Sequence, residues 1–311
     1  MVIHAARLVS VVIPTRNRPE LLRQALDSVR AQAPGIPVQI IVADNAPQAE
    51  VAAIAEDYRA DYLATDAVGA GAVRNAGLKL ARGDYIAFLD DDDAWTAEHL
   101  SSHLSRLESD PGLGATVSRM TIGDADARPE GGEPMPAGNP KGADLFSLFL
   151  SYFPSVCAVV ARSAAVAALG GFDERLIHAE DWDWNLRLAL ANRVGFVDHT
   201  TFVMRWRSAQ SQYDCQLRWV RLGYFHRVFW TNLLRAGRRR PPLRELVGTY
   251  RRQTGTFAIW LCECAQHNLE SGDRRAFLVR LGQAFVASPP HTLAWLARRW
   301  RPNAHHLDHS M

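Results

Sequence analysis

Short apolar runs separated by amphipathic segments are the feature that most limits how this chain can fold. Residues 8–15, 38–45 and 85–89 have the length and composition of strands that are buried on both faces. Between the first two runs, Leu22 and Leu26 lie one helical turn apart on an apolar face. Because strands that alternate with helices form parallel sheets, the pattern predicts an α/β fold with a mostly parallel central sheet.

Charged residues are distributed unevenly along the chain. Residues 1–204 contain 17 Lys and Arg against 27 Asp and Glu, whereas residues 205–302 contain 18 against 5. The later part also has a helical pattern of apolar residues. We therefore expect an α/β domain over residues 1–210, a basic helical region over 211–302 and a polar tail over 303–311.

The basic region predicts a negatively charged partner. Nucleic acid, anionic lipid headgroups and a phosphate-bearing substrate all fit its charge, and a solvated arginine-rich surface explains it as well. Residues 230–246 and 293–300 combine tryptophan with arginine, a mixture that suits a membrane surface. Packing of helix against helix accounts for the same aromatic residues.

The hydropathy pattern predicts no membrane-spanning segment. No apolar run approaches the ~20 residues that such a helix requires, and we find no signal-peptide pattern. We therefore expect a cytoplasmic protein, with peripheral contact at the inner face of the membrane as an alternative for the basic helices.

Four consecutive aspartates at positions 90–93 follow the apolar run of residues 85–89. Like charges raise each other's pKa unless a cation lies among them, so a bound divalent cation explains why a buried strand ends there. Ligands that are all oxygen favour magnesium, manganese or calcium over zinc, and the four cysteines have no zinc-ligand spacing. A solvated acidic loop is the alternative explanation.

Five segments, taken in order, resemble glycosyltransferase family 2. They read VSVVIPTRNRPELLRQALDSV, IIVADN, GAVRNAGLKLARGDYIAFLDDDDAW, GGFDE and EDWDWNLRLA, and the resemblance covers about two thirds of the chain. It implies a GT-A fold, a nucleotide-binding α/β sandwich that transfers a sugar from a nucleoside diphosphate sugar to an acceptor, usually with inversion. A helical region is expected to follow this sandwich.

The resemblance also implies residues that bind the nucleotide. Pro14, Thr15 and Arg18 match the first-strand motif that lines the nucleotide pocket. Asp44 matches the carboxylate that binds the base, commonly uracil, whose N3–H it can accept in a hydrogen bond. Arg74 matches an arginine that lies near the nucleotide, and its fixed charge suits that contact.

Within the acidic run, the resemblance implies a D-x-D metal-binding motif. Asp90 and Asp92 match positions that contact the nucleotide, and Asp92 and Asp93 match positions that hold Mn²⁺ or Mg²⁺. Asp91 falls where the family accepts many residues. A cation there would stabilise the negative charge that develops on a departing diphosphate.

Two acidic residues open the segment EDWDWNLRLA. Asp181 matches the general base of the family, with Glu180 as its neighbour or substitute. A carboxylate that removes the proton of an acceptor hydroxyl supplies ~100- to 10,000-fold in rate. Both residues also suit a helix N-terminus for electrostatic reasons alone.

The loop after residue 204 contains no histidine, so Arg205 or Arg207 is the candidate for positive charge near the pyrophosphate.

The sequence therefore predicts a metal-dependent glycosyltransferase. A UDP-linked donor is expected from family frequency, and the acceptor is a saccharide, a lipid-linked molecule or a small molecule. A polyprenyl-phosphate glycosyltransferase and a non-catalytic nucleotide-sugar binding protein are the alternatives. A sugar nucleotidyltransferase would need a glycine-rich phosphate loop after the first strand, and PTRNRPE is not one. No nucleic acid partner is expected.

Overall fold

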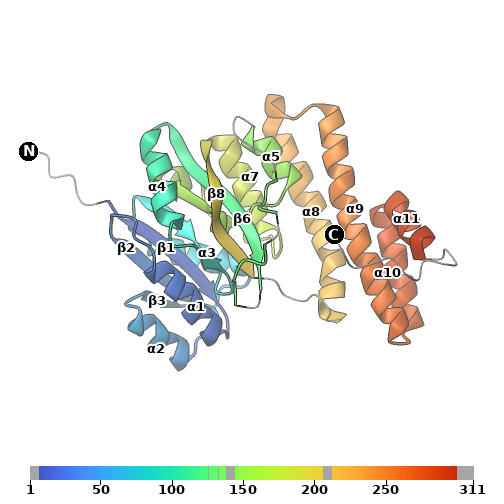
Figure 1. Cartoon of the computed structure of the whole chain (residues 1–311), viewed down its shortest axis with the longest axis horizontal. Helices are drawn as coiled ribbons and strands as arrows, with labels where there is room; N and C mark the ends of the chain where they lie inside the picture. The colour runs from blue at the N-terminus through green and yellow to red at the C-terminus, as the bar shows by residue number, and fades with distance from the viewer. Residues whose placement is uncertain (1–6, 125, 132, 138–143, 206–211, 300–311) are drawn as a thin grey trace, which may run out of the picture. The chain divides into compact units, whose positions relative to one another are not determined.

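The computed structural model describes residues 7–124, 126–131, 133–137, 144–205 and 212–299. The chain divides into two compact units (Figure 1). The first comprises Met1–Arg207 and Thr231–Gly237, and the second comprises Ser208–Trp230 and Arg238–Met311. Arg207, one of the two predicted pyrophosphate contacts, lies outside the described residues.

Among the described residues, eight strands of the first unit form one sheet in the order β3-β2-β1-β4-β7-β6-β8-β5. The first half of this order is parallel throughout, and the apolar runs predict three of its four strands, all but β3. The four strands are β1 (Val9–Thr15), β2 (Val38–Asp44), β3 (Asp61–Ala64) and β4 (Tyr85–Phe88). The predicted α/β fold with a mostly parallel sheet is confirmed.

The second half of the sheet is mixed. β7 (Val159–Arg162) runs antiparallel to both β4 and β6 (Leu113–Gly123), whereas β6 and β8 (Arg193–Arg205) pair in parallel. The short strand β5 (Ala94–Trp95) pairs antiparallel with β8 and follows the acidic run directly. The chain after the four aspartates therefore returns to the sheet at once, which fixes the run between two strands.

Helices pack on the parallel strands as the periodicity predicts. All seven residues of β1 are buried, and α1 (Pro19–Arg30) buries the face that contains Leu22 and Leu26. The other helices of this unit up to residue 205 are α2 (Ala49–Asp57), α3 (Ala70–Leu78), α4 (His99–Ser109), α5 (Leu145–Ser151), α6 (Ser163–Leu169) and α7 (Glu180–Ala191).

The predicted C-terminal helical region is also confirmed. It consists of α8 (Gln212–Ala236), α9 (Leu243–Glu270), α10 (Arg274–Ala287) and α11 (Pro289–Arg299), with a short 3₁₀ helix at Gly237–Arg239. Over the part of the chain that the structure describes, no helix combines the length and the hydropathy needed to cross a membrane.

Candidate active site

The carboxyl ends of β1, β2 and β4 bring the predicted nucleotide residues to one edge of the sheet. In the parallel register of β1 and β2, Thr15 lies opposite Asp44, and Pro14 precedes it on the same buried strand. Asp44 is fully buried and accepts hydrogen bonds from the Tyr62 hydroxyl (3.0 Å) and the backbone N–H of Ala46 (2.9 Å). Open parallel sheets bind their ligands beyond this edge.

Asp91 joins the acidic run to the end of β1. Its buried carboxylate accepts hydrogen bonds from the Thr15 hydroxyl (2.8 Å) and from Arg18 Nη1 (3.1 Å). Thr15 and Arg18, both predicted to bind the nucleotide, therefore hold the acidic run in place. The resemblance gave Asp91 no role, because the family accepts many residues there, and these contacts join segments more than 70 residues apart in the chain.

Asp92 and Asp93 differ in their surroundings. The side chain of Asp92 is 17% exposed and lies 3.4 Å from Arg18 Nη1. Asp93 is buried and accepts a hydrogen bond from the backbone N–H of Arg205 (2.9 Å) at the end of β8. Burial and the neighbouring charge of Asp90 raise the pKa of Asp93 to about 8. A cation at this position would relieve both effects.

Arg205 fastens the acidic run to β8 and α1. Its Nε donates to the backbone carbonyl of Asp92 (2.7 Å), and its Nη2 donates to Gln24 Oε1 (2.6 Å). Nε and Nη2 of the guanidinium that was predicted to meet the pyrophosphate are thus engaged by protein groups.

A group of three ligand atoms tests whether the residues suit a divalent cation. Oxygens of Asp90 and Asp93 and the Sγ of Cys157 lie within 4.8 Å of one another. Burial raises the pKa of the Cys157 thiol well above its usual value, so the sulfur stays protonated. The two carboxylates suit Mn²⁺ or Mg²⁺, and the soft, neutral thiol does not.

Arg74 connects the acidic run to the helix that bears the predicted base. Its guanidinium is 3% exposed and donates to Asp90 Oδ1 (2.5 Å) and Glu180 Oε1 (2.9 Å). Burial lowers the pKa of Arg74, but the charges of Asp90 and Glu180 raise it by more. Glu180 is therefore paired with a permanent cation.

Asp181 has the properties expected of a general base. Its Oδ1 accepts a hydrogen bond from the backbone N–H of Trp182 (2.7 Å) in the first turn of α7. Burial and the charge of Glu180 raise the pKa of Asp181 to about 7, with a further contribution from Asp90. A carboxylate whose pKa lies near neutrality can both hold and release a proton under ordinary conditions.

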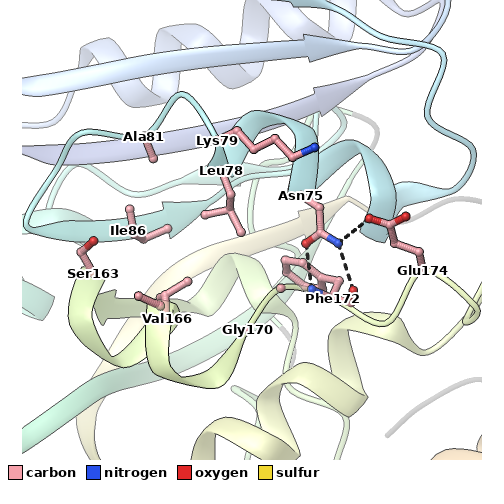
Figure 2. Close-up of a pocket in the computed structure, with 12 residues that line it drawn as sticks. Asn75, Leu78, Lys79, Ala81, Ile86, Ser163, Val166, Gly170, Phe172 and Glu174 are labelled. Atoms are coloured by element: carbon pink, nitrogen blue, oxygen red, sulfur yellow. Dashed lines mark hydrogen bonds between the residues drawn. The ribbon is translucent and has the colours of Figure 1, made fainter.

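Asn75, next to Arg74, clamps the turn that reads GGFDE (Figure 2). Its side-chain amide donates to the carbonyl of Phe172 (3.0 Å) and accepts from the Phe172 N–H (2.8 Å), as a paired strand would. It also donates to Glu174 (2.9 Å). A Cβ at Gly171 would lie 2.3 Å from Asn75 Oδ1, so this position requires glycine. Asn75 of α3 and the turn GGFDE are therefore held together shortly before α7 begins.

A cavity of about 450 Å³ lies beside this clamp. Its lining includes Leu78 at the end of α3, Lys79 directly after it, Val166 of α6 and Ile86 of β4 (Figure 2). None of the aspartates at 90–93 and none of the three acidic residues of α7 lines it. We therefore do not assign it to the donor.

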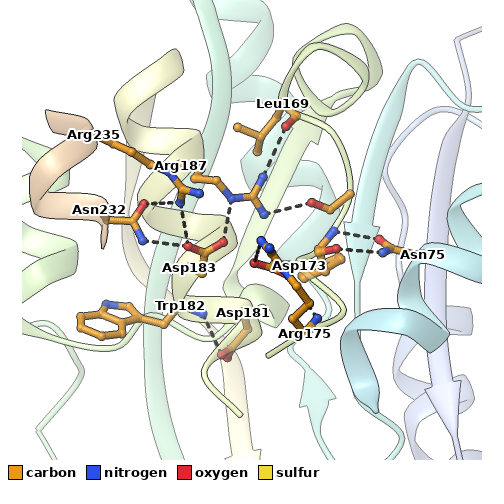
Figure 3. A network of polar contacts seen from close by, with 12 residues as sticks. Asn75, Leu169, Asp173, Arg175, Asp181, Trp182, Asp183, Arg187, Asn232 and Arg235 are labelled. Carbon is orange, nitrogen blue, oxygen red and sulfur yellow. Dashed lines mark hydrogen bonds and ion pairs between the residues drawn. The ribbon is translucent and has the colours of Figure 1, made fainter. Parts of the chain in front are cut away.

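A second polar network holds α7 from its other side (Figure 3). The buried carboxylate of Asp183 accepts from Arg187 Nε (2.7 Å), Asn232 Nδ2 (2.8 Å) and Arg235 Nη1 (3.0 Å). The last two residues belong to the terminal turns of α8, which are part of the first unit. Sequence reasoning missed this network because nothing local in residues 180–187 indicates contact with residues 232–235.

Comparison with known proteins gives a consistent result. Residues 10–166, just over half of the chain, match the family model described as Glycosyl transferase family 2. An uncharacterized glycosyltransferase of Methanocaldococcus jannaschii is 27% identical over 210 residues, which cover 64% of this chain and 70% of that protein. The amylovoran biosynthesis glycosyltransferase AmsB of Erwinia amylovora is 31% identical over 199 residues (60% and 64%). The pre-mycofactocin glycosyltransferase of Mycobacterium tuberculosis is 29% identical over 231 residues (67% and 46%).

Solved structures support the fold. Staphylococcus aureus TarS 1–349, crystallised with UDP-GlcNAc, has a TM-score of 0.52 at 17% identity and covers 89% of this chain and 91% of that one. The mannosyltransferase PcManGT of Pyrobaculum calidifontis, in complex with GDP-Man and Mn²⁺, has a TM-score of 0.55 at 15% identity (96% and 89%).

Proposed function

The chain belongs to glycosyltransferase family 2, and we propose that it transfers a sugar from a nucleoside diphosphate sugar to an acceptor hydroxyl with the aid of a divalent cation. The observation that carries this proposal is the arrangement around Arg74. This one buried cation touches Asp90 of the acidic run and Glu180, the neighbour of Asp181. This contact supports the proposal because it joins the proposed metal site and the proposed base in one charge network.

For the cation, we propose Asp92 and Asp93 as ligands, with the Asp90 carboxylate beside them. The proximity of Asp90 and Asp93 and the raised pKa of Asp93 support a cation at Asp93, because both indicate excess negative charge; Asp92 is proposed from the resemblance to the D-x-D motif. A bound Mn²⁺ or Mg²⁺ would supply electrostatic stabilisation of the departing diphosphate.

In the proposed reaction, Asp181 removes the proton of the acceptor hydroxyl as that oxygen attacks the anomeric carbon. The bond from the anomeric carbon to the diphosphate oxygen breaks in the same step, and its electron pair leaves with the diphosphate. A single displacement of this kind inverts the anomeric configuration. Glu180 does not act as the base in this scheme, because it is paired with Arg74.

The identity of the donor is open to direct test. A uridine nucleotide is proposed because Asp44 can accept the N3–H of uracil, and TarS, which shares the fold, was crystallised with UDP-GlcNAc. PcManGT was crystallised with GDP-Man, so a guanosine donor belongs in the same test. The named relatives act in amylovoran biosynthesis and on pre-mycofactocin, which leaves saccharide, lipid-linked and small-molecule acceptors as candidates.

A thermal-shift panel followed by a turnover assay tests the proposal. Donors such as UDP-GlcNAc and GDP-mannose are added with and without Mn²⁺, and we expect a rise in Tm that requires both components. The stabilising donor is then assayed for release of its nucleoside diphosphate, with and without polyprenyl phosphate as acceptor. Stabilisation without any release would favour a non-catalytic binding protein, and no stabilisation by any donor would contradict the proposal.

A further inference from the structure

One face of α10 is exposed and apolar. Leu278 and Val286 are 65% and 73% exposed, and Val279 and Phe285 are exposed beside them. These positions recur at intervals of three, four and seven residues, so together with the exposed Gly282 they form one continuous stripe along the helix.

The opposite face of α10 is already used in packing. Ala284 is fully buried with Leu261 and Cys262 of α9, and Leu281 packs against the same cluster. A helix that is apolar on both faces is normally buried on both. Among the residues of the second unit that the structure describes, only one of the two faces of α10 is covered.

The charge of this region is entirely positive. Residues 274–299 contain five arginines and neither aspartate nor glutamate. Arg274 and Arg275 are exposed at the start of the apolar stripe, and α11 exposes Leu293 and Arg298 in the same way.

The neighbouring helix α9 provides the contrast. It also exposes large apolar residues, such as Leu243 and Ile259. These are interspersed with exposed carboxylates at Glu245, Glu263 and Glu270. The exposed apolar residues of α10 and α11 therefore lie beside arginine alone, in contrast to those of α9.

We propose that the exposed faces of α10 and α11 bind the surface of an anionic lipid bilayer. Such a surface places negative headgroups directly beside an apolar interior, which matches a stripe of leucine, valine and phenylalanine bordered by arginines. A second copy of the chain fits less well, because residues 274–299 of that copy would offer these arginines no carboxylate partner. This proposal does not depend on the glycosyltransferase reaction.

Co-sedimentation of the full chain with lipid vesicles tests the proposal. We expect the chain to pellet with vesicles that contain phosphatidylglycerol, to remain in solution with pure phosphatidylcholine, and to dissociate at high salt. Val286→Glu and Leu278→Glu place a carboxylate in the stripe, and each is expected to lower the partition coefficient about tenfold or more.

The matched control is Leu243→Glu on α9, which changes the charge equally at a side chain that is 76% exposed. It should leave the partition coefficient within about twofold of the unmodified chain. An equal loss in Leu243→Glu and Val286→Glu would show that only net charge matters and would overturn the proposal. So would the absence of pelleting with both kinds of vesicle, or an oligomer in solution that dissociates in Val286→Glu.

Discussion

The charged side chains at the acidic edge of the sheet and those beside the apolar stripe of α10 differ in burial and in pairing. At the edge, the charges are mostly buried and touch other charges: Arg74 lies between Asp90 and Glu180, and Arg18 lies near Asp91 and Asp92. On α10, charge is exposed beside exposed apolar side chains. Paired, buried charges position groups for chemistry, whereas exposed charges of one sign are suited to an extended surface.

This comparison predicts that single substitutions at the acidic edge will have the largest effects, and Asp181→Asn the largest of all. Loss of the general base should lower kcat by ~100- to 10,000-fold while donor binding is nearly unchanged. The measurement is steady-state kinetics together with a donor-induced thermal shift. Glu180→Gln is the paired variant: it should keep most of kcat, because Glu180 is bound to Arg74. If Glu180→Gln lost as much kcat as Asp181→Asn, the base would be wrongly assigned.

Replacement of Arg74 tests whether the pairing at the edge is structural. Arg74→Met leaves two carboxylates without their cation and should lower the free energy of unfolding by ~3–5 kcal/mol. Arg74→Lys, which keeps the charge but cannot span both partners with a planar fork, should lose less. Urea unfolding measures both. The control is Arg82→Met, which removes an exposed pair with Asp61 and should cost under about 1 kcal/mol. Equal losses at Arg74 and Arg82 would contradict the pairing.

The sequence could predict the features of the site that leave a local pattern of residues, and it could not predict contacts between distant segments. The strand that ends in Asp44 and the strand that shortly precedes Asp90 were predicted, because burial on both faces leaves a local pattern of apolar residues. The contacts of Asp91 with Thr15 and of Asp183 with Asn232 were not, because each joins segments far apart in the chain. The roles given to the individual site residues stay predictions until they are tested by substitution.

In the turn that reads GGFDE, the structure gives a physical reason for the glycine at position 171. The motif was visible in the sequence, but its partner, Asn75, became apparent only when α3 and the turn met. Gly171→Ala should lower the free energy of unfolding by ~1–3 kcal/mol, because the added Cβ would lie 2.3 Å from Asn75 Oδ1. Thermal unfolding measures the loss. The double variant Asn75→Ala with Gly171→Ala should lose less than the sum of the single losses; strict additivity would contradict the contact.

Turnover at the acidic edge is expected to depend on pH, whereas vesicle binding by α10 is not. Asp181 must be deprotonated to accept a proton, and its pKa is raised to about 7, so kcat/KM should be full above this value and fall tenfold per pH unit below it. Glu180→Gln removes a charge that raises this pKa and should move the acid limb to lower pH. Vesicle binding by α10 should not change over the same range, because arginine keeps its charge. A rate that is constant from about pH 5 to about pH 8 would contradict the role of Asp181.

The smallest expected effect is a gain in stability, in contrast to the losses expected at Arg74 and Gly171. Gly282 lies in the exposed stripe of α10, and a Cβ built there meets nothing within 4 Å. Gly282→Ala should therefore raise the free energy of unfolding by ~0.5–1 kcal/mol, because alanine loses less backbone entropy than glycine in a helix. Urea unfolding of this variant beside Gly171→Ala measures the contrast between an open surface and a closed contact. A loss of stability in Gly282→Ala would mean that a further part of the protein covers α10 in solution, and the stripe would then be unavailable to a bilayer.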